Sequence, residues 1–510
     1  MKLTATITGL LTAQAQQRPN APFIIDAGAQ YSYSDIYSLS RRFATLLSER
    51  GVVKGDRVAL LCGNSAAYLV AWFGANFAGA TAVTLNTELM GDGLLFSLRQ
   101  SDPRIVVADA SWIEAKWSAL DSALQALPTI AIDSVSDFFQ SLRPYAEAAL
   151  LPTHRSDIAT IVYTSGTTGL PKGVMSSHGE YAAVGVAGVD VVDLTPQDRT
   201  MIFLPLFHSN AQMLGVLPVL TAGASMALFK RFSASTFFDD AARVGATGFT
   251  FVGTVVSILA VRHPGVQRNH KLRFALGGGT PKQIWPRIEQ DFGFKVNELY
   301  GMTEVGGWVT GNSARATRIG SCGTVRPDME VRIFDENDEE VPVGVQGEIV
   351  VRPRKPGILL SGYFQNDREM VQACRNLWFH TGDRGSFDED GYLFLSGRLK
   401  ELIRRSGEMI SPTEIETQLR QMPGVLDCAV VGVDDDVAGE EIKAVLVVSS
   451  AVAPAAVRSF LEGRLPLFML PRYVEFIDVI PRTETEKILR RKLQYLNDQV
   501  HDLGSPKPPR

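Results

Sequence analysis

Residues 161–174 read IVYTSGTTGLPKGV and combine three kinds of residue in a set order. A β-branched, apolar run ends at Thr164, a loop of glycines and small hydroxyl residues follows, and Lys172 closes the loop. Glycines let backbone N–H groups approach phosphate oxygens, hydroxyls add donors, and the lysine adds a mobile charge. This composition predicts a phosphate-binding loop, although a solvent-exposed turn is the alternative for such a loop taken alone. It is not a Walker A loop, because Lys172 precedes Gly173 rather than Ser or Thr.

The segments on both sides of this loop alternate between helical and strand patterns. Residues 35–50 have helical spacing, an apolar run follows at 57–62, and a second helical pattern covers 65–78. A similar order returns at 215–229 and 244–253. Helices that alternate with short β-rich runs predict α/β layers with mainly parallel sheets.

The pattern changes in the last third of the chain. Residues 330–351 alternate apolar and polar side chains around a turn rich in Asp, Asn and Glu, which predicts antiparallel hairpins. A further unit of two helices and two strands begins near Lys400 and is long enough for a small α+β domain. We therefore expect an N-terminal domain at 1–399 and a C-terminal domain at 400–510.

Composition and charge exclude several classes of protein. The formal net charge of −5 over 510 residues gives no electrostatic case for nucleic acid as a partner. The four cysteines are scattered and form no C-x-x-C pair, so neither a zinc site nor a disulfide framework is indicated. No apolar run reaches the roughly 20 residues that a membrane span needs, and the N-terminus is too weakly apolar for a signal peptide. We expect a cytoplasmic protein with reduced thiols.

The run YTSGTTGLPKG at 163–173 closely resembles the signature loop of the adenylate-forming superfamily, which contains acyl-CoA synthetases, adenylation domains and luciferases. Four further motifs of that family follow in the same order along nearly the whole chain: YGMTE at 300–304, TGD at 381–383, GRLKELIRRSGEMISPTEIE at 397–416 and PRTETEKI at 481–488. The resemblance implies an α/β fold with a large N-terminal region of two α/β subdomains and a small β-barrel. A small, mobile α+β C-terminal domain would follow.

The resemblance also implies a chemistry. A carboxylate attacks the α-phosphorus of ATP while pyrophosphate leaves, so catalysis is mostly positioning and charge neutralisation. The positions that match the family's site for the β- and γ-phosphates are Thr164, Ser165, Gly166, Thr167, Thr168, Gly169 and Lys172. The other matching nucleotide positions are Gly278, Gly279, Tyr300 and Gly301 around the base or acyl group, Thr303 at the α-phosphate, Glu304 at Mg²⁺, and Asp383 with Arg398 at the ribose.

The C-terminal motifs carry three further roles in the resembling enzymes. Lys487 would reach the active site during adenylation and bridge the carboxylate and the α-phosphate. Lys400 falls at the hinge position, and the segment with Ser406 and Gly407 would line the tunnel for a pantetheine thiol. One residue departs from the family pattern: Glu486 stands where glycine is usual, so its side chain and charge put the efficiency of adenylation in question.

The stretch PLFHSNAQ at 205–212 matches the part of acyl- and aryl-CoA synthetases that lies beside the acid. His208 matches a gating aromatic or histidine near the carboxylate, with a packed core histidine as the alternative reading. The stretch lacks the aspartate that binds an α-amino group, which argues against a free amino acid. Asn210 and Gln212 indicate an acid with some polarity, and the surrounding sequence resembles that of carnitine/crotonobetaine-CoA ligases.

These residues favour an AMP-forming acid–CoA ligase that uses ATP, Mg²⁺ and CoA and acts on a small carboxylic acid. Three alternatives remain open at this point. The acyl group could pass to a carrier-protein phosphopantetheine, the enzyme could be a luciferase-like oxygenase, or the chain could be an impaired acid- or adenylate-binding protein, to which only Glu486 points. The sequence leaves the acid, the pathway and the oligomeric state open.

Overall fold

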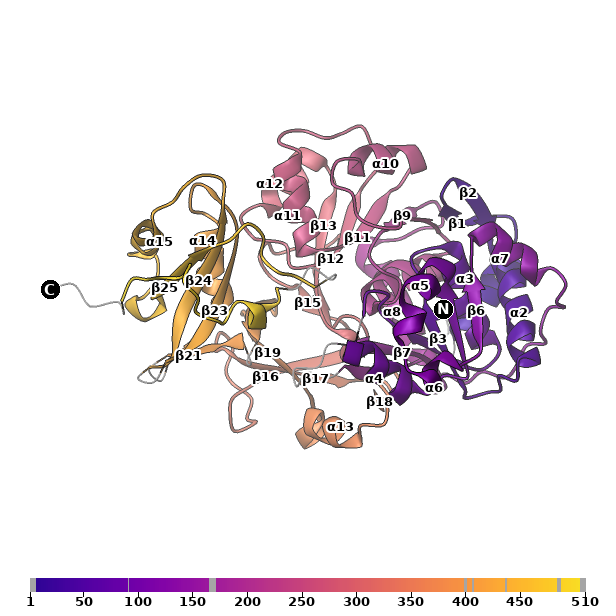
Figure 1. Ribbon diagram of the computed structural model, residues 1–510. Helices are drawn as coiled ribbons and strands as arrows, with labels where there is room; N and C mark the ends of the chain where they lie inside the picture. The colour runs from indigo at the N-terminus through magenta and orange to yellow at the C-terminus, as the bar shows by residue number, and fades with distance from the viewer. Residues whose placement is uncertain are drawn as a thin grey trace. The chain divides into compact units, whose positions relative to one another are not determined.

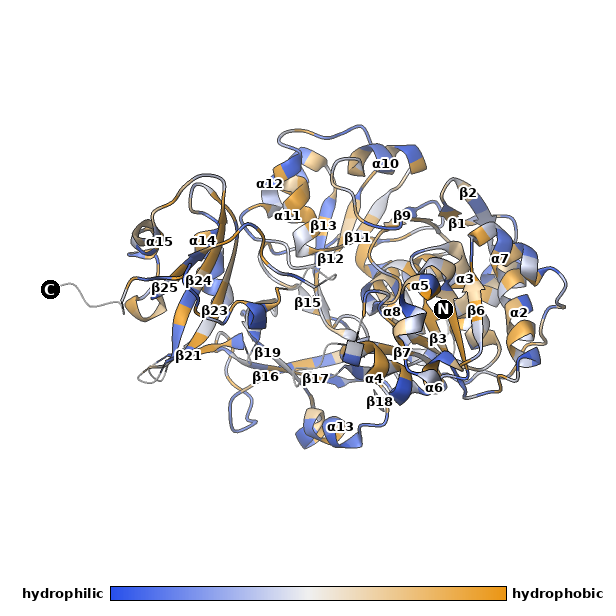
Figure 2. Ribbon diagram, viewed as in Figure 1, coloured by the Kyte–Doolittle hydropathy of each residue, from blue (hydrophilic) through white to orange (hydrophobic). Residues whose placement is uncertain are grey.

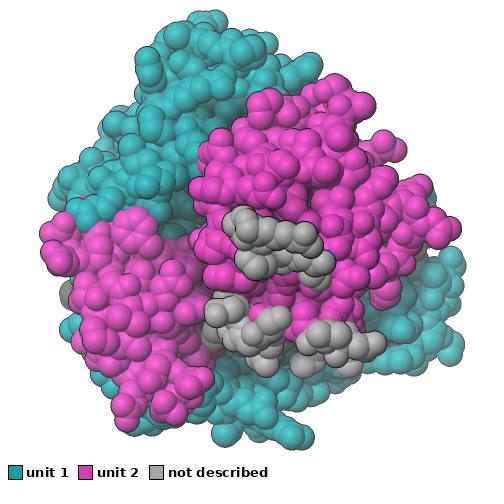
Figure 3. Space-filling view, turned by 90° about the vertical axis from the view of Figure 1, so that its left-hand side faces the viewer, with its two compact units in different colours: residues 1–331, 351–379 teal, residues 332–350, 380–510 magenta. Residues whose placement is uncertain are grey.

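The computed structural model describes residues 6–89, 91–164, 171–398, 401–405, 408–435, 438–483 and 488–504. The chain divides into two compact units (Figure 3). One unit contains residues 1–331 and 351–379, and the other contains residues 332–350 and 380–510. The expected domain boundary near Lys400 stays a prediction, because residues 399 and 400 lie outside the described ranges.

A seven-stranded sheet forms one half of the first unit (Figure 1). Its order is β18 (Gly362–Tyr363), β8 (Lys172–Ser177), β7 (Ile158–Thr164), β4 (Thr81–Thr84), β3 (Arg57–Leu61), β5 (Ile105–Asp109) and β6 (Thr129–Ile132). The strands from β7 to β6 pair in parallel and are rich in buried Val, Ile and Ala, as expected for a sheet covered on both faces. Strand β8 pairs with β7 in antiparallel register, which places Lys172 directly opposite Thr164.

A nine-stranded sheet forms the other half of this unit. Its order is β15 (Thr324–Val325), β14 (Thr310–Gly311), β13 (Lys295–Tyr300), β12 (Phe274–Gly278), β11 (Gly248–Val252), β9 (Arg199–Ile202), β10 (Ser225–Leu228), β1 (Pro22–Asp26) and β2 (Ala29–Ser32). The six strands from β13 to β1 pair in parallel. The expected α/β architecture with mainly parallel sheets is therefore confirmed.

Helices cover and separate the two sheets. They are α1 (Ile7–Gln17), α2 (Tyr33–Glu49), α3 (Ala66–Phe77), α4 (Gly91–Ser101), α5 (Ala110–Lys116), α6 (Ser122–Gln125), α7 (Val135–Leu142), α8 (His178–Val192), α9 (Leu217–Ala222), α10 (Phe237–Val244), α11 (Gly253–Arg262), α12 (Trp285–Phe292) and α13 (Asp367–Ala373). Helix α3 is buried along its whole length and contacts strands of both sheets, so it belongs to the core between them. In Figure 2 the strands β3 and β7 have the hydrophobic colour that such burial requires.

The chain passes between the two units within strands of a four-stranded sheet, in the order β16 (Met329–Phe334), β17 (Gly347–Pro353), β19 (Phe379–Phe387) and β20 (Leu393–Arg398). In the ranges that the structure describes, this sheet stands where the resemblance implies a small barrel, and no strand pairing closes it into a ring. Strands β19 and β20 of this sheet pair in antiparallel register. Within residues 330–351, where the sequence predicts hairpins, an isolated antiparallel bridge joins Phe334 to Glu340.

The C-terminal part of the second unit is a small α+β fold. Its strands are β21 (Ile403–Arg405), β22 (Glu408–Ile410), β23 (Val425–Asp435), β24 (Gly439–Val448), β25 (Tyr473–Phe476) and β26 (His501–Asp502), with helices α14 (Pro412–Leu419) and α15 (Pro454–Leu461). Apolar residues of both helices and of β23, β24 and β25 form one core cluster. Within the described ranges of the chain, we find no helix with the length and apolar character to cross a membrane.

Candidate active site

Three motifs that are far apart in the sequence meet at one edge of the nine-stranded sheet. His208 follows β9, the glycines 277–279 end β12, and residues 300–304 end β13. These strands and β11 are neighbours and run in parallel, so their carboxyl ends share one edge. Ligands of open α/β sheets bind outside the carboxyl ends of the strands, which makes this edge the expected place for a site.

The turn after β12 brings the backbone unusually close to its neighbours. A Cβ on Gly277 would lie 2.1 Å from the Phe251 carbonyl oxygen, and a Cβ on Gly278 would lie 2.6 Å from the Leu299 carbonyl oxygen. Gly279 has a φ of +94°, in the region that favours glycine. Only glycine therefore fits at these positions, because neighbouring backbone occupies the space that a side chain would fill.

The carboxylate of Glu298 fixes this turn from the neighbouring strand. It accepts hydrogen bonds from the backbone N–H of Gly279 and, at 3.1 Å, from that of Thr280. Burial raises the pKa of Glu298 to about 7, and the two backbone donors act in the opposite direction by favouring the charged form. Glu298 lies two residues before Tyr300 on β13, so one strand positions both the glycine turn and the tyrosine.

The motif at 300–304 is tied to the loop that carries His208. The hydroxyl groups of Thr303 and Ser209 lie 2.8 Å apart and share a hydrogen bond. The His208 ring packs beside Phe207 with ring centroids 4.5 Å apart. A π-helix follows at Asn210–Val216, and such helices are frequent at functional sites. The two loops are thus held together as one structure.

Lys172, at the end of the predicted phosphate-binding loop, lies in a cluster with Glu304. Lys172 forms an ion pair with Glu369 of α13, and its Nζ lies 5.5 Å from the centre of the Tyr363 ring. The Tyr363 hydroxyl donates a 3.3 Å hydrogen bond to the Glu304 carboxylate. The loop of one sheet and the 300–304 motif of the other therefore meet through Tyr363 on β18.

A buried acid lies next to this cluster. Glu180, in the first turn of α8, is 1% exposed and accepts 3.3 Å hydrogen bonds from the Ser176 hydroxyl and the Ser177 backbone N–H. Burial raises its pKa to about 8, and the negative charge of Glu304 adds to this rise, whereas Arg326 opposes it. Arg326 donates to the carbonyl oxygens of Gly306 and Trp308, directly after the 300–304 motif.

Because the pKa of Glu180 is raised, we expect the stability of the protein to depend on pH through this residue. Its ordinary pKa is 4.5 and its value in the folded protein is about 8, so between these pH values the folded state binds more protons than the unfolded state. The stability that this group contributes is complete below pH 4.5 and is lost as the pH rises to 8. The variant Glu180→Gln removes this titration, and we expect its melting temperature relative to wild type to rise by on the order of 5 °C between pH 5 and pH 8.

Thermal unfolding of both proteins across this pH range measures the effect. The matched control is Glu49→Gln, which removes the charge of an exposed glutamate. Other buried acids titrate equally in wild type and variant and cancel in the difference. A difference in melting temperature that does not change with pH would contradict the assigned cause.

Asp383 and Arg398 face each other in the second unit. They are register partners on β19 and β20, and the Arg398 Nε lies 3.1 Å from the Asp383 carboxylate. Gly382 before them has a φ of +71°. Glu348 accepts the Gly382 N–H at 3.0 Å and contacts His380 Nδ1 at 2.8 Å, so it holds the part of β19 that presents Asp383.

The same glutamate and histidine belong to the one group with metal-ligand spacing among the described residues. Asp338, Glu348 and His380 bring their ligand atoms within 4.8 Å of one another. The contacts of Glu348 with His380 and Gly382 already fix the part of β19 before Asp383. We therefore assign this group a structural role in positioning that part of the strand.

Several predicted residues lie outside the described ranges. These are Ser165, Gly166, Thr167, Thr168 and Gly169 of the phosphate-binding loop and Lys400, Ser406, Gly407 and Lys487 of the C-terminal motifs. Their roles stay predictions. Of the others, the first unit brings together Thr164, Lys172, His208, Gly278, Gly279, Tyr300, Gly301, Thr303 and Glu304, and the second unit holds Asp383 and Arg398.

The prediction that Gln212 faces the acid and indicates its polarity is wrong. Gln212 is fully buried, accepts a hydrogen bond from the Tyr181 hydroxyl and donates to the Leu206 carbonyl oxygen at 2.6 Å. Its polar atoms are therefore used within the core. Asn210 is different: it is partly exposed, and its buried side-chain oxygen has no hydrogen-bond partner within the described residues.

Four polar residues of the site were not predicted from the sequence: Glu180, Glu298, Tyr363 and Glu369. For Glu180 a signal exists, since it is a charged residue in the first turn of a mostly apolar helix. For Glu298 the sequence KVNELY of β13 gives no comparable signal. Tyr363 and Glu369 follow the loop by about 190 residues in the chain, and their contact with Lys172 depends on the pairing of β18 with β8.

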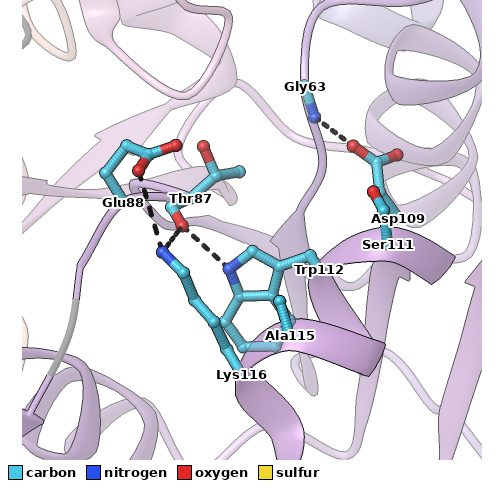
Figure 4. Close-up of a pocket in the computed structure, with 8 residues that line it drawn as sticks. All are labelled: Gly63, Thr87, Glu88, Asp109, Ser111, Trp112, Ala115 and Lys116. Carbon is cyan, nitrogen blue, oxygen red and sulfur yellow. Dashed lines mark hydrogen bonds and ion pairs between the residues drawn. The ribbon is translucent and has the colours of Figure 1, made fainter.

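A surface pocket of about 260 Å³ lies elsewhere in the first unit (Figure 4). Its lining residues are Gly63, Thr87, Glu88, Asp109, Ser111, Trp112, Ala115 and Lys116. Lys116 Nζ and Trp112 Nε1 both donate to the Thr87 carbonyl oxygen, at 2.7 and 2.8 Å. The pocket contains none of the predicted site residues, and its polar groups bond to one another, so we assign it no part in the reaction.

Comparison with known proteins gives a consistent result over nearly the whole chain. The model of the AMP-binding enzyme family matches residues 11–364, and that of the AMP-binding enzyme C-terminal domain matches residues 414–487. An oxalate–CoA ligase of Arabidopsis thaliana is 32% identical over 95% of this chain and 97% of its own. A crotonobetaine/carnitine–CoA ligase of Salmonella heidelberg is 29% identical over 91% and 93%.

Solved structures agree with this likeness. The crystal structure of ATP-bound MatB from Rhodopseudomonas palustris superimposes with a TM-score of 0.88 and 30% sequence identity. The match covers 96% of this chain and 98% of that one. The expected resemblance to carnitine/crotonobetaine-CoA ligases is thus confirmed at the level of relatives, but the oxalate–CoA ligase is somewhat more similar, so the resemblance does not select the acid.

Proposed function

The chain belongs to the AMP-binding enzyme family, and we propose that it activates a small, polar carboxylic acid with ATP and passes the acyl group to coenzyme A. It is an AMP-forming acid–CoA ligase, and its products are acyl-CoA, AMP and pyrophosphate. The observation that supports the site most directly is the cluster of Lys172, Tyr363 and Glu304, next in sequence to Thr303, which is bonded to Ser209.

The residues of this cluster fit a magnesium–nucleotide. Lys172 supplies a positive charge at the end of the phosphate-binding loop, and Glu304 supplies a carboxylate oxygen of the kind that Mg²⁺ prefers. Gly279 at the end of β12 is exposed and carries no side chain, so a ligand could approach the protein closely at this point. When bound, Mg²⁺ neutralises phosphate charge and orients the triphosphate.

The chain's own residues would then position the reacting groups. Lys172 would hold the β- and γ-phosphates, Thr303 would donate its hydroxyl hydrogen to an α-phosphate oxygen, and Asp383 would accept hydrogen bonds from the ribose hydroxyls. Fixing the acid close to the α-phosphorus converts a bimolecular attack into a positioned one. The cationic and hydroxyl groups stabilise the negative charge that develops on the α-phosphate.

The acid itself is proposed to be small and polar. The side-chain oxygen of Asn210, two residues after His208, has no hydrogen-bond partner within the described residues and could bind a polar acid. Gln212 is bonded within the core and is not part of the pocket. The acids named for the two relatives, oxalate and crotonobetaine or carnitine, are both small and polar. Free α-amino acids are disfavoured, because the stretch 205–212 has no acidic residue to bind an ammonium group.

Acid-dependent pyrophosphate release from MgATP, with and without CoA, tests the proposal. The panel contains short dicarboxylates, hydroxy acids, betaines, aryl acids and medium-chain fatty acids. We expect release with a small polar acid and accumulation of its CoA thioester. Preference for a medium-chain fatty acid would contradict the proposed acid class, and release with no thioester except on a phosphopantetheinylated carrier protein would replace CoA as the acceptor.

A further inference from the structure

Glu369 contacts the lysine of the phosphate-binding loop from a different part of the chain. It lies in the first turn of α13, where its backbone N–H donates at 3.3 Å to the side chain of the N-cap residue Asn366. Its carboxylate forms the ion pair with Lys172. The Lys172 side chain is 12% exposed and that of Glu369 is 27% exposed, so the pair is partly shielded from water.

The ion pair engages the Lys172 ammonium group, which the triphosphate would need for its own binding. An ammonium group has three hydrogens to donate, and Glu369 takes at least one of them while neutralising the charge. Because Tyr363 lies beside the same Nζ and bonds to Glu304, the carboxylate stands close to the proposed positions of the phosphates and the metal ion. A second anion placed there would repel Glu369 and compete with it for Lys172.

We infer that Glu369 is an internal competitor of the triphosphate and sets the affinity of this enzyme for MgATP. This inference rests on the proposed role of Lys172 in binding the β- and γ-phosphates. In the free protein Glu369 holds Lys172, and nucleotide binding exchanges the carboxylate for phosphate oxygens. The free energy of the broken ion pair is subtracted from that of binding, so the observed affinity is lower than Lys172 alone would give.

Glu369 should affect the affinity for ATP but not the affinity for AMP. ATP presents β- and γ-phosphates to Lys172 and must displace Glu369. AMP has neither phosphate and leaves the ion pair intact. Glu369 therefore acts on the ratio of the two affinities, which a general loss of structure would not change in the same direction.

The test is the dissociation constant of MgATP and of AMP for the full-length protein without acid or CoA, measured by calorimetry. The variant Glu369→Gln keeps the size of the side chain and removes its charge. Since partly shielded ion pairs contribute up to about 1 kcal/mol, we expect it to bind MgATP roughly fivefold more tightly and AMP as wild type does. The gain should shrink at high salt, because salt screens the pair.

The matched control is Asp367→Asn. Asp367 lies in the same first turn of α13 and contributes the same charge near the helix N-terminus, but it is exposed. It therefore reproduces any loss of helix stability without touching the ion pair. We expect its affinities for MgATP and AMP to stay at the wild-type values.

Two further variants identify the source of any failure. Lys172→Met should weaken MgATP but not AMP, and if it leaves both unchanged, the proposed role of Lys172 is wrong. In the Lys172→Met background, Glu369→Gln should lose most of its effect. If Lys172→Met behaves as expected but Glu369→Gln leaves MgATP unchanged or weakens it, the proposed function stands and the competitor role of Glu369 is refuted.

Discussion

Replacement of Lys487 by alanine is expected to slow acid-dependent pyrophosphate release about 100-fold or more, the usual loss when one charge-stabilising donor is removed from an active site. The acid and the α-phosphate are both anions, so their approach needs a cation between them. The motif PRTETEKI assigns this role to Lys487, which lies outside the described residues. Transfer of the acyl group from a preformed acyl-adenylate to CoA needs no such bridge and should change by less than about threefold.

Two assays of the same preparation measure this difference. One follows pyrophosphate release with acid and MgATP, and the other follows thioester formation from synthetic acyl-adenylate and CoA. Lys492→Ala is the matched control, because it removes an exposed lysine from the same C-terminal segment. Equal loss in both assays would indicate damage to the whole domain, and no loss in the first assay would remove Lys487 from the mechanism and support the impaired-protein alternative that Glu486 raises.

The sequence predicted those parts of the fold that local patterns determine. The apolar run into Thr164 is strand β7, as the pattern predicts. The strand β8 that begins at Lys172 and pairs with β7 in antiparallel register was not predicted. The alternation of helix and strand correctly predicted parallel sheets, because a parallel connection needs a crossover that is usually helical. The implied barrel differs, since the described strands β16, β17, β19 and β20 form a four-stranded sheet.

The sequence predicted fewer of the residues that contact and position the proposed site residues. Glu369 and Tyr363 reach Lys172 only because β18 pairs with β8, and no local pattern reports a pairing between such distant segments. For Gln212 the sequence predicted a contact with the ligand that the structure does not support. Its side chain is hydrogen-bonded to the buried Tyr181 hydroxyl and to the Leu206 carbonyl oxygen. A polar residue near a motif has two possible partners, the ligand and the core, and sequence alone does not separate them.

Replacement of Asp383 by asparagine is expected to raise the KM for ATP by roughly 30- to 100-fold, because two hydrogen bonds from the ribose hydroxyls lose their charged acceptor. The pairing with Arg398 at 3.1 Å and the hold of Glu348 on Gly382 fix the carboxylate before the nucleotide arrives. A ligand that lacks both hydroxyls makes neither bond. The KM for 2′,3′-dideoxy-ATP should therefore be high for wild type and change by less than about threefold in the variant.

The ratio of the two KM values is the decisive quantity, because damage to β19 or to the domain would affect both nucleotides. Glu389→Gln is the matched control, since Glu389 is an exposed acid in the connection between β19 and β20. It should leave both KM values unchanged. If Asp383→Asn raised the KM for ATP and for its dideoxy analogue by the same factor, the carboxylate would act on the local structure of β19 and not on the ribose. The proposed role of Asp383 would then be wrong.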